Sequence, residues 1–142
     1  MQAGIAAADE LAIRNLLSRY AHTLDGRRAD EFVALFVEDA LLRAAGNEFR
    51  GREQIRGFVV SLLDKEPGKH VTVNTDLRAA SADRVEVTSD FLLLARSADS
   101  WSIGRAGRYD DVVERDAAGV WRFRTRVIVF APTSNAVDRA EP

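Results

Sequence analysis

Cysteine is absent from the 142-residue sequence. Without a thiol, the chain can form no disulfide, no thiolate nucleophile and no sulfur site for a metal. Long apolar runs are also missing, because none approaches the roughly 18 residues that a membrane helix needs. The opening "MQAGIAAADE" lacks the basic start and long apolar core of a secretory signal, so we expect a cytoplasmic protein with no membrane partner.

Charge of one sign is not in excess either. The sequence has 20 basic and 22 acidic residues, which are interspersed and give a formal net charge of -2. We expect no nucleic-acid partner, because neutralising phosphates would require a basic face or stripe. The 2 histidines lie far apart and the carboxylates are scattered over turns, so no metal site is expected. No glycine-rich phosphate loop is present, and we expect no nucleotide or other cofactor.

Three amphipathic helices are predicted in the first half of the chain. Apolar residues recur at spacings of three and four between Asp9 and Leu24, with Asp9 as a candidate N-cap. Asp30 is expected to cap a shorter second helix that has Phe36 among its inward-facing residues. A third helix is expected within "REQIRGFVVSLLDKEPG", whose predicted inward face comprises Ile55, Phe58, Val59, Leu62 and Leu63.

Strands are predicted around and after the third helix. A short hairpin with Gly46 and Asn47 at its turn precedes that helix, and from Lys69 onward the apolar period changes to two. Four segments follow, and the links "ADR", "ADSWS" and "DAAG" have the length of hairpin connections, which require antiparallel neighbours. We therefore predict an α+β fold, a cone-shaped barrel in which three N-terminal helices pack on a curved, mostly antiparallel sheet.

The length indicates one domain over residues 1–142. Its core is expected to span about residues 9–132, followed by a flexible C-terminal tail, "TSNAVDRAEP". Apolar surface on the outer face of the sheet, such as "VIVF" at residues 127–130, would be covered by homo-oligomerisation.

A cone of this kind has an apolar mouth with a few polar groups, which is typical of a small-molecule pocket. His70 shares one predicted strand face with Asn74, and it is either a structural histidine or a general base. Tyr20 belongs to the apolar helical stripe and points inward, so His22, two residues later, points to solvent. Asp25 precedes Gly26, where a turn alone explains it, but a partner such as an imidazolium would also suit a carboxylate there.

Four segments carry a family resemblance: "AIRNLLSRYAHTLDGRRADEFVALFVEDA", "FRGREQIRGFV", "KHVTVN" and "GRYDDVVERDAAGVWRFRTR". Their order and spacing resemble the SnoaL-like family of the nuclear-transport-factor-two-like superfamily over roughly residues 9–132. The polar positions are nearest the branch that contains bile acid dehydratase, scytalone dehydratase and hexachlorocyclohexane dehydrochlorinase. The superfamily also hosts isomerases, cyclases, hydrolases and non-catalytic binders, so the fold alone does not select a function.

The resemblance implies catalytic roles for four residues. Enzymes of that branch pair an aspartate at the end of the first helix with a histidine at the start of the first long strand, which correspond to Asp25 and His70. Tyr20 resembles the tyrosine beside that pair, and Arg126 resembles an arginine of the dehydrochlorinase pocket. Strict alternation would place Arg126 on the exposed face with Arg124, so it reaches the pocket only if a bulge turns the strand.

Three further residues are candidates for substrate binding. Asn74 is expected to hydrogen-bond the substrate or to satisfy backbone groups, and Phe58 is expected to line the pocket. Trp101 is expected in a turn region, at the edge of either the pocket or an interface. Asp110 and Asp111 point to opposite strand faces, so at most one enters the cone and the other is a surface charge.

The expected function is a cofactor-free lyase that removes water or another leaving group from a hydrophobic alicyclic, steroid-like or polyketide-like small molecule. Asp25 and His70 would form the catalytic dyad. An isomerase or cyclase of the same fold is the first alternative, and a non-catalytic small-molecule-binding or assembly module is the second. The resemblance implies a homo-oligomer, either a trimer or a dimer.

Overall fold

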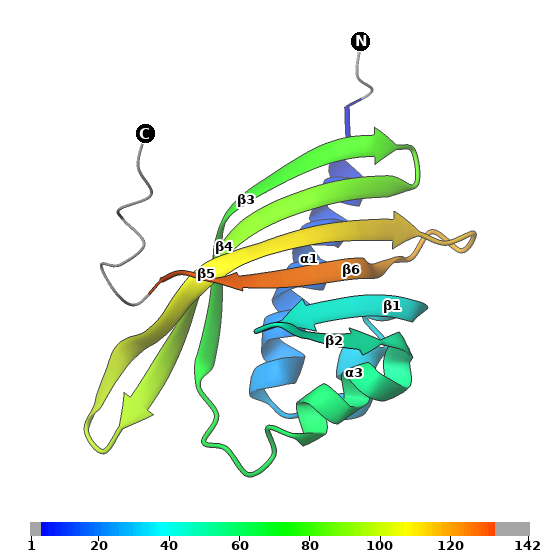
Figure 1. The fold of residues 1–142 in the computed structure, drawn as a ribbon. Helices are drawn as coiled ribbons and strands as arrows, with labels where there is room; N and C mark the ends of the chain where they lie inside the picture. Colours follow the sequence, from blue (N-terminus) through cyan, green and yellow to red (C-terminus); the bar gives the residue numbers. More distant parts are fainter. Residues whose placement is uncertain (1–3, 133–142) are drawn as a thin grey trace, which may run out of the picture.

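A computed structural model of the protein describes residues 4–132. Figure 1 shows a curved sheet with the helices gathered on one side of it. The helices are α1 (Ala7–Asp25), α2 (Ala29–Val33) and α3 (Gly51–Val60). The strands are β1 (Phe36–Ala44), β2 (Asn47–Arg50), β3 (Lys69–Ser81), β4 (Arg84–Ser97), β5 (Ser100–Arg115) and β6 (Trp121–Phe130). The predicted α+β class is confirmed.

The strand order in the sheet is β2-β1-β6-β5-β4-β3. Strands β3 to β6 form the predicted antiparallel meander, and β1 joins it through a parallel pairing with β6. Within the described residues, β2 and β3 are edge strands, so the sheet curves around the helices without closing into a barrel.

The hydrophobic core fills the concave side of this sheet. The stripe predicted for the first helix is buried there, from Ile13 to Leu24. Aromatic rings dominate the centre, where Tyr20 lies 5.1 Å from Phe32 and 5.8 Å from Phe123 between ring centroids. This packing holds the C-terminal end of α1 against the sheet, where α1 contacts β3.

Two predicted helix caps are wrong. Ala6, not Asp9, is the N-cap of α1, and the Asp9 carboxylate instead accepts hydrogen bonds from Trp121 Nε1 (2.9 Å) and Arg115 Nη1 (3.1 Å). Asp30 lies within α2, and its carboxylate forms an ion pair with Arg56 of α3. In both cases an arginine from a distant element binds the carboxylate, in place of the backbone N–H groups that a cap would use.

Three boundaries also differ from the prediction. Phe36 begins β1 instead of continuing the second helix, and α3 ends at Val60, so Leu63 lies outside the helix and is exposed. Trp101 lies in β5, because the β4–β5 hairpin turns over residues 98–99 and extends the strand pairing beyond the predicted link. The predicted flexible tail, residues 133–142, lies outside the described residues. In the described part of the chain, no helix is long and apolar enough to cross a membrane.

Candidate active site

The end of α1 meets the start of β3 through Asp25 and His70. Asp25 Oδ1 lies 2.5 Å from His70 Nδ1, and Asp25 Oδ2 accepts the His70 backbone N–H at 3.0 Å. Both carboxylate oxygens therefore hold the same residue, which fixes the imidazole relative to the helix. A carboxylate in this position favours the proton on Nδ1 and leaves Nε2 as an acceptor.

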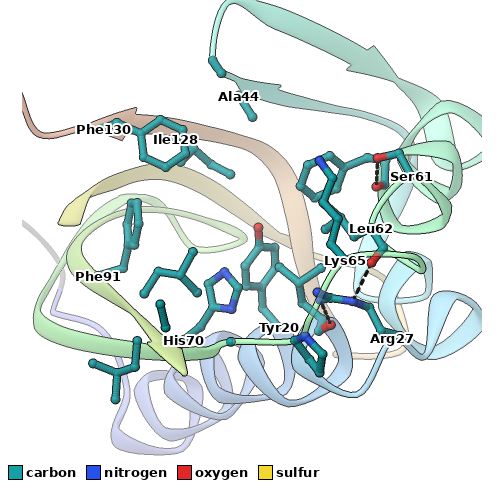
Figure 2. A pocket seen from close by; sticks show the side chains of 18 of the residues that line it. Tyr20, Arg27, Ala44, Ser61, Leu62, Lys65, His70, Phe91, Ile128 and Phe130 are labelled. Carbon is teal, nitrogen blue, oxygen red and sulfur yellow. Dashed lines mark hydrogen bonds between the residues drawn. The ribbon is translucent and has the colours of Figure 1, made fainter. Parts of the chain in front are cut away.

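This pair lies beside a cavity of about 530 Å³ between the helices and the sheet. His70 and Tyr20 line the cavity, and Figure 2 shows their side chains next to each other. Most of the wall is apolar, with one side formed by β4 and β6 and another by α3. The apolar side chains that line it include Leu24, Phe49, Phe58, Leu62, Phe91, Leu93, Leu94, Ile128 and Phe130. An apolar cavity with few polar groups is the usual composition of a small-molecule site.

Tyr20 brings a protonated hydroxyl to the cavity. Its side chain is 1% exposed, and its hydroxyl has no hydrogen-bond partner among the described residues. Burial raises the pKa of Tyr20 above its ordinary value, and the positive charge of Arg126 opposes that rise. The hydroxyl is therefore neutral near pH 7 and free to donate to a ligand.

Arg126 lies directly behind this tyrosine. The β5–β6 pairing shifts by one residue between Phe123 and Thr125, so Arg124 has no pairing residue on β5 and forms a β-bulge. The bulge turns Arg126 inward, as the prediction required, and the side chain is 0% exposed.

The Arg126 guanidinium is bound by Asp111 and covered by aromatic rings, while its Nη1 has no hydrogen-bond partner among the described residues. Its Nε and Nη2 each donate to the Asp111 carboxylate at 2.8 Å, and its Cζ lies 4.0 Å from the ring centroid of Tyr20 and 3.8 Å from that of Tyr109. Arg126 does not line the cavity, since the two tyrosine rings separate it from the space. Arg126 therefore contacts Tyr20 from the side of the ring that faces the core.

Of the three residues predicted to bind substrate, one lines the cavity and two do not. Phe58 lines the cavity as predicted, but Asn74 and Trp101 do not. Asn74 has a positive φ of 53° within a register shift of β3, and its side chain donates to Asp90 at 2.9 Å on the exposed surface. This irregularity breaks the alternation that had put Asn74 on the His70 face. Trp101 is 54% exposed.

Three other polar residues are oriented as predicted. His22 is exposed on α1, away from the cavity, while Asp111 is buried and Asp110 is exposed. Asp111 is a partner of Arg126 and does not line the cavity.

Sequence reasoning missed several lining residues. Tyr109 lies two positions before Asp111 on the same inward face, and its ring stacks on Phe91 at 4.5 Å between centroids. The alternation in "GRYDD" was a usable signal for Tyr109. The charged lining residues Arg27, Lys65 and Arg96 had no such signal, because they lie in a turn, a loop and a strand end.

Residues 4–132 contain no group of three or more histidine, cysteine or acidic side chains arranged to hold a metal ion. The Asp25–His70 pair and Tyr20 bring an imidazole, a carboxylate and a phenol together at the cavity. Such groups can move a proton and donate a hydrogen bond to developing negative charge.

Comparisons with known proteins agree with this architecture. A candidate scytalone dehydratase from Novosphingobium aromaticivorans DSM 12444 is similar at 24% identity and a TM-score of 0.78, over 94% of this chain and 96% of that chain. ActVI-ORFA from Streptomyces coelicolor is similar at 25% identity and a TM-score of 0.78, over 85% of this chain and 96% of that chain. LinA is similar at 25% identity and a TM-score of 0.78, over 95% of both chains. No match is found among proteins of curated function.

A family model also covers most of the sequence. The model described as the SnoaL-like domain matches residues 6–127, which include all three helices and most of the sheet. The match runs through both halves of the candidate site, from Tyr20 to Arg126. The chain therefore belongs to the SnoaL-like domain family.

Proposed function

We propose that the protein is a cofactor-free lyase that eliminates water, or another leaving group, from a hydrophobic small molecule. The observation that carries the proposal is the contact between Asp25 and His70 at the wall of an apolar cavity. A histidine held by a carboxylate through one ring nitrogen is suited to accept a proton through the other. The similarity in fold to a candidate scytalone dehydratase supports this choice of reaction class.

The proposed reaction moves one proton from carbon to nitrogen. His70 Nε2 takes a proton from a substrate carbon, and the electrons of that C–H bond form the new double bond. The leaving hydroxyl departs from the neighbouring carbon with the bonding pair and takes a proton from the Tyr20 hydroxyl to form water. The His70 imidazolium then returns its proton to the Tyr20 oxygen, which restores both groups. The Asp25 carboxylate stabilises the resulting imidazolium. The Arg126 charge acts through Tyr20, which it stacks against, and not by touching the substrate.

Substitution of the dyad tests the proposal. We expect His70→Ala and Asp25→Asn each to lower turnover by about a hundred- to ten-thousand-fold, the usual contribution of a positioned general base. His22→Ala is the matched control, since it removes the other histidine of the chain from an exposed site and should leave turnover unchanged. The measurement is turnover of a panel of hydroxylated alicyclic and polyketide-like compounds, followed by mass spectrometry.

The mass of the product separates the alternatives. Loss of the mass of water identifies elimination, whereas an unchanged mass identifies an isomerase or a cyclase and overturns the proposed reaction. Near wild-type turnover in His70→Ala would contradict the dyad. If His70→Ala binds ligand as tightly as the wild type and no compound is turned over by either, the protein is a binding module and not an enzyme.

A further inference from the structure

Three cationic side chains line the same cavity. Arg27 comes from the turn after α1, Lys65 from the loop after α3, and Arg96 from the end of β4. Glu66 is the one carboxylate among the cavity-lining residues in the described part of the chain. The proposed elimination uses none of these charges, so their presence in an otherwise apolar wall calls for a separate explanation.

The cations have no carboxylate partner among the described residues. Neither Lys65 nor Arg96 forms an ion pair there, and Arg27 donates only to backbone carbonyls, those of Leu24 (2.8 Å) and Leu62 (3.1 Å). Many other arginines are paired, as with Arg124, which contacts both Asp39 and Glu114, although Arg19, Arg105 and Arg108 form no ion pair among the described residues. Arg27, Lys65 and Arg96 differ from those three in lining the cavity. Unpaired cations beside low-dielectric walls create a positive potential that attracts an anionic ligand.

Two of these charges, those of Arg27 and Lys65, lie on the opposite side of the cavity from two aromatic side chains. Figure 2 shows Phe91 and Phe130 on one side of the cavity, Arg27 and Lys65 on the other, and Tyr20 and His70 between them. A ligand that fills this space would lay an apolar body on the aromatic wall and turn an acidic group toward the cations. The Asp25 carboxylate does not line the cavity, and both of its oxygens face His70.

We propose that the cavity selects an amphipathic organic anion, a hydrophobic ring system that carries an acidic group, with Lys65 and Arg96 as the residues that bind that group. This inference rests on the proposed function only in calling the ligand the substrate. Arg27 plays a smaller part, because two of its N–H groups already hold backbone carbonyls. Binding of the acidic group by Lys65 and Arg96 would hold it away from the Asp25–His70 dyad and would place the ring carbons next to His70.

Two fluorescent dyes with the same aromatic body provide the test. Anilinonaphthalene sulfonate carries a sulfonate, and N-phenylnaphthylamine is its uncharged counterpart. The wild-type protein should bind the sulfonate dye more tightly. The double variant Lys65→Met and Arg96→Met should lose about five- to tenfold in affinity for the sulfonate dye, the scale expected for two exposed charge contacts, and little for the neutral dye. Raising the salt concentration should weaken only sulfonate binding, because exposed charges are screened within about 10 Å at 0.1 M.

The matched control removes two charges from elsewhere. Arg14 and Arg19 are exposed on α1 and do not line the cavity, so the double variant Arg14→Met and Arg19→Met should bind both dyes as the wild type does. Equal loss of sulfonate binding in the control variant would overturn the proposal, as would equal affinity of the wild type for the two dyes or the absence of binding by either.

The dye measurements do not depend on catalysis. Because neither dye is a substrate, His70→Ala should keep the preference for the sulfonate dye even if its turnover is abolished. Failure of the lyase proposal and failure of the anion proposal therefore give different results.

Discussion

Arg126 and Asp111 form a charged pair in the middle of the core. Both side chains are 0% exposed, and the pair is covered by the rings of Tyr20 and Tyr109. A buried pair of this kind contributes little net stability relative to apolar residues, yet losing one partner leaves an uncompensated charge in a low-dielectric medium. Its position behind the cavity tyrosines indicates that it orients them, since the guanidinium touches both rings.

The pair predicts an asymmetric response to substitution. Arg126→Met alone, or Asp111→Leu alone, should lower the free energy of unfolding by about 3–5 kcal/mol, because each leaves a buried charge unpaired. The double variant should be more stable than either single variant. Urea denaturation provides the measurement, with exposed Arg19→Met as a control expected to change stability by no more than about 0.5 kcal/mol. Additive losses in the double variant would contradict the coupling.

At the scale of elements, the packing of β4, β5 and β6 beside the cavity leaves no room for a side chain at one position. At Gly107 of β5, a Cβ atom would lie 2.3 Å from the Val129 carbonyl oxygen and 2.6 Å from the Phe91 ring. No side chain fits there without moving the backbone of β6 or the aromatic wall. The absence of a side chain at Gly107 thus lets Phe91 stack on Tyr109.

Alanine at two glycines separates this packing effect from a backbone effect. Gly107→Ala should destabilise the protein by about 1–3 kcal/mol, as overpacking of a close contact usually does, and should weaken binding of N-phenylnaphthylamine by moving Phe91. Gly57→Ala in α3 has open space for its methyl group and should raise stability by about 0.5–1 kcal/mol through helix propensity. Thermal and urea unfolding of the two variants check both signs, and equal stability would contradict the close approach.

On the scale of the whole molecule, the outer face of the sheet carries exposed apolar side chains. The register aligns Val73, Asp90, Arg108 and Val129 in one row across β3 to β6, and both valines of that row are exposed. Trp101 and Ile103 are also exposed, near the β4–β5 hairpin. These apolar side chains, interspersed with the charged Asp90 and Arg108, make this face a candidate for contact between subunits.

We therefore expect the protein to form a dimer or a trimer through this face. Val129→Glu should shift the population toward the monomer, because it places a charge in the contact. The control is Val120→Glu, which alters a valine of similar exposure (43% against 49%) in the β5–β6 connection, away from the outer sheet face. Size-exclusion chromatography with light scattering measures both, and a monomeric wild type would refute the expectation.

Periodicity in the sequence predicted most of the fold because it depends on local burial. The stripe from Ile13 to Leu24 specifies one buried helical face, and the period of two after Lys69 specifies the meander. The short connections between these strands predicted that neighbouring strands are antiparallel, as they are for β3 to β6. The parallel pairing of β1 with β6 was outside this reasoning, since it joins segments that no short connection links.

The candidate site shows the same contrast: the sequence identifies its residues, and the tertiary structure determines which of them meet. Sequence alone identified Asp25, His70 and Tyr20 as candidates, but only the folded chain brings the Asp25 carboxylate to 2.5 Å from the His70 ring, across 45 positions. The bulge at Arg124 and the positive φ at Asn74 reversed the simple alternation, turning Arg126 inward and Asn74 outward. Both are properties of strand pairing, which depends on the neighbouring strand as much as on the residue itself. Arg27, Lys65 and Arg96 likewise come together only because a turn, a loop and a strand end meet around one cavity.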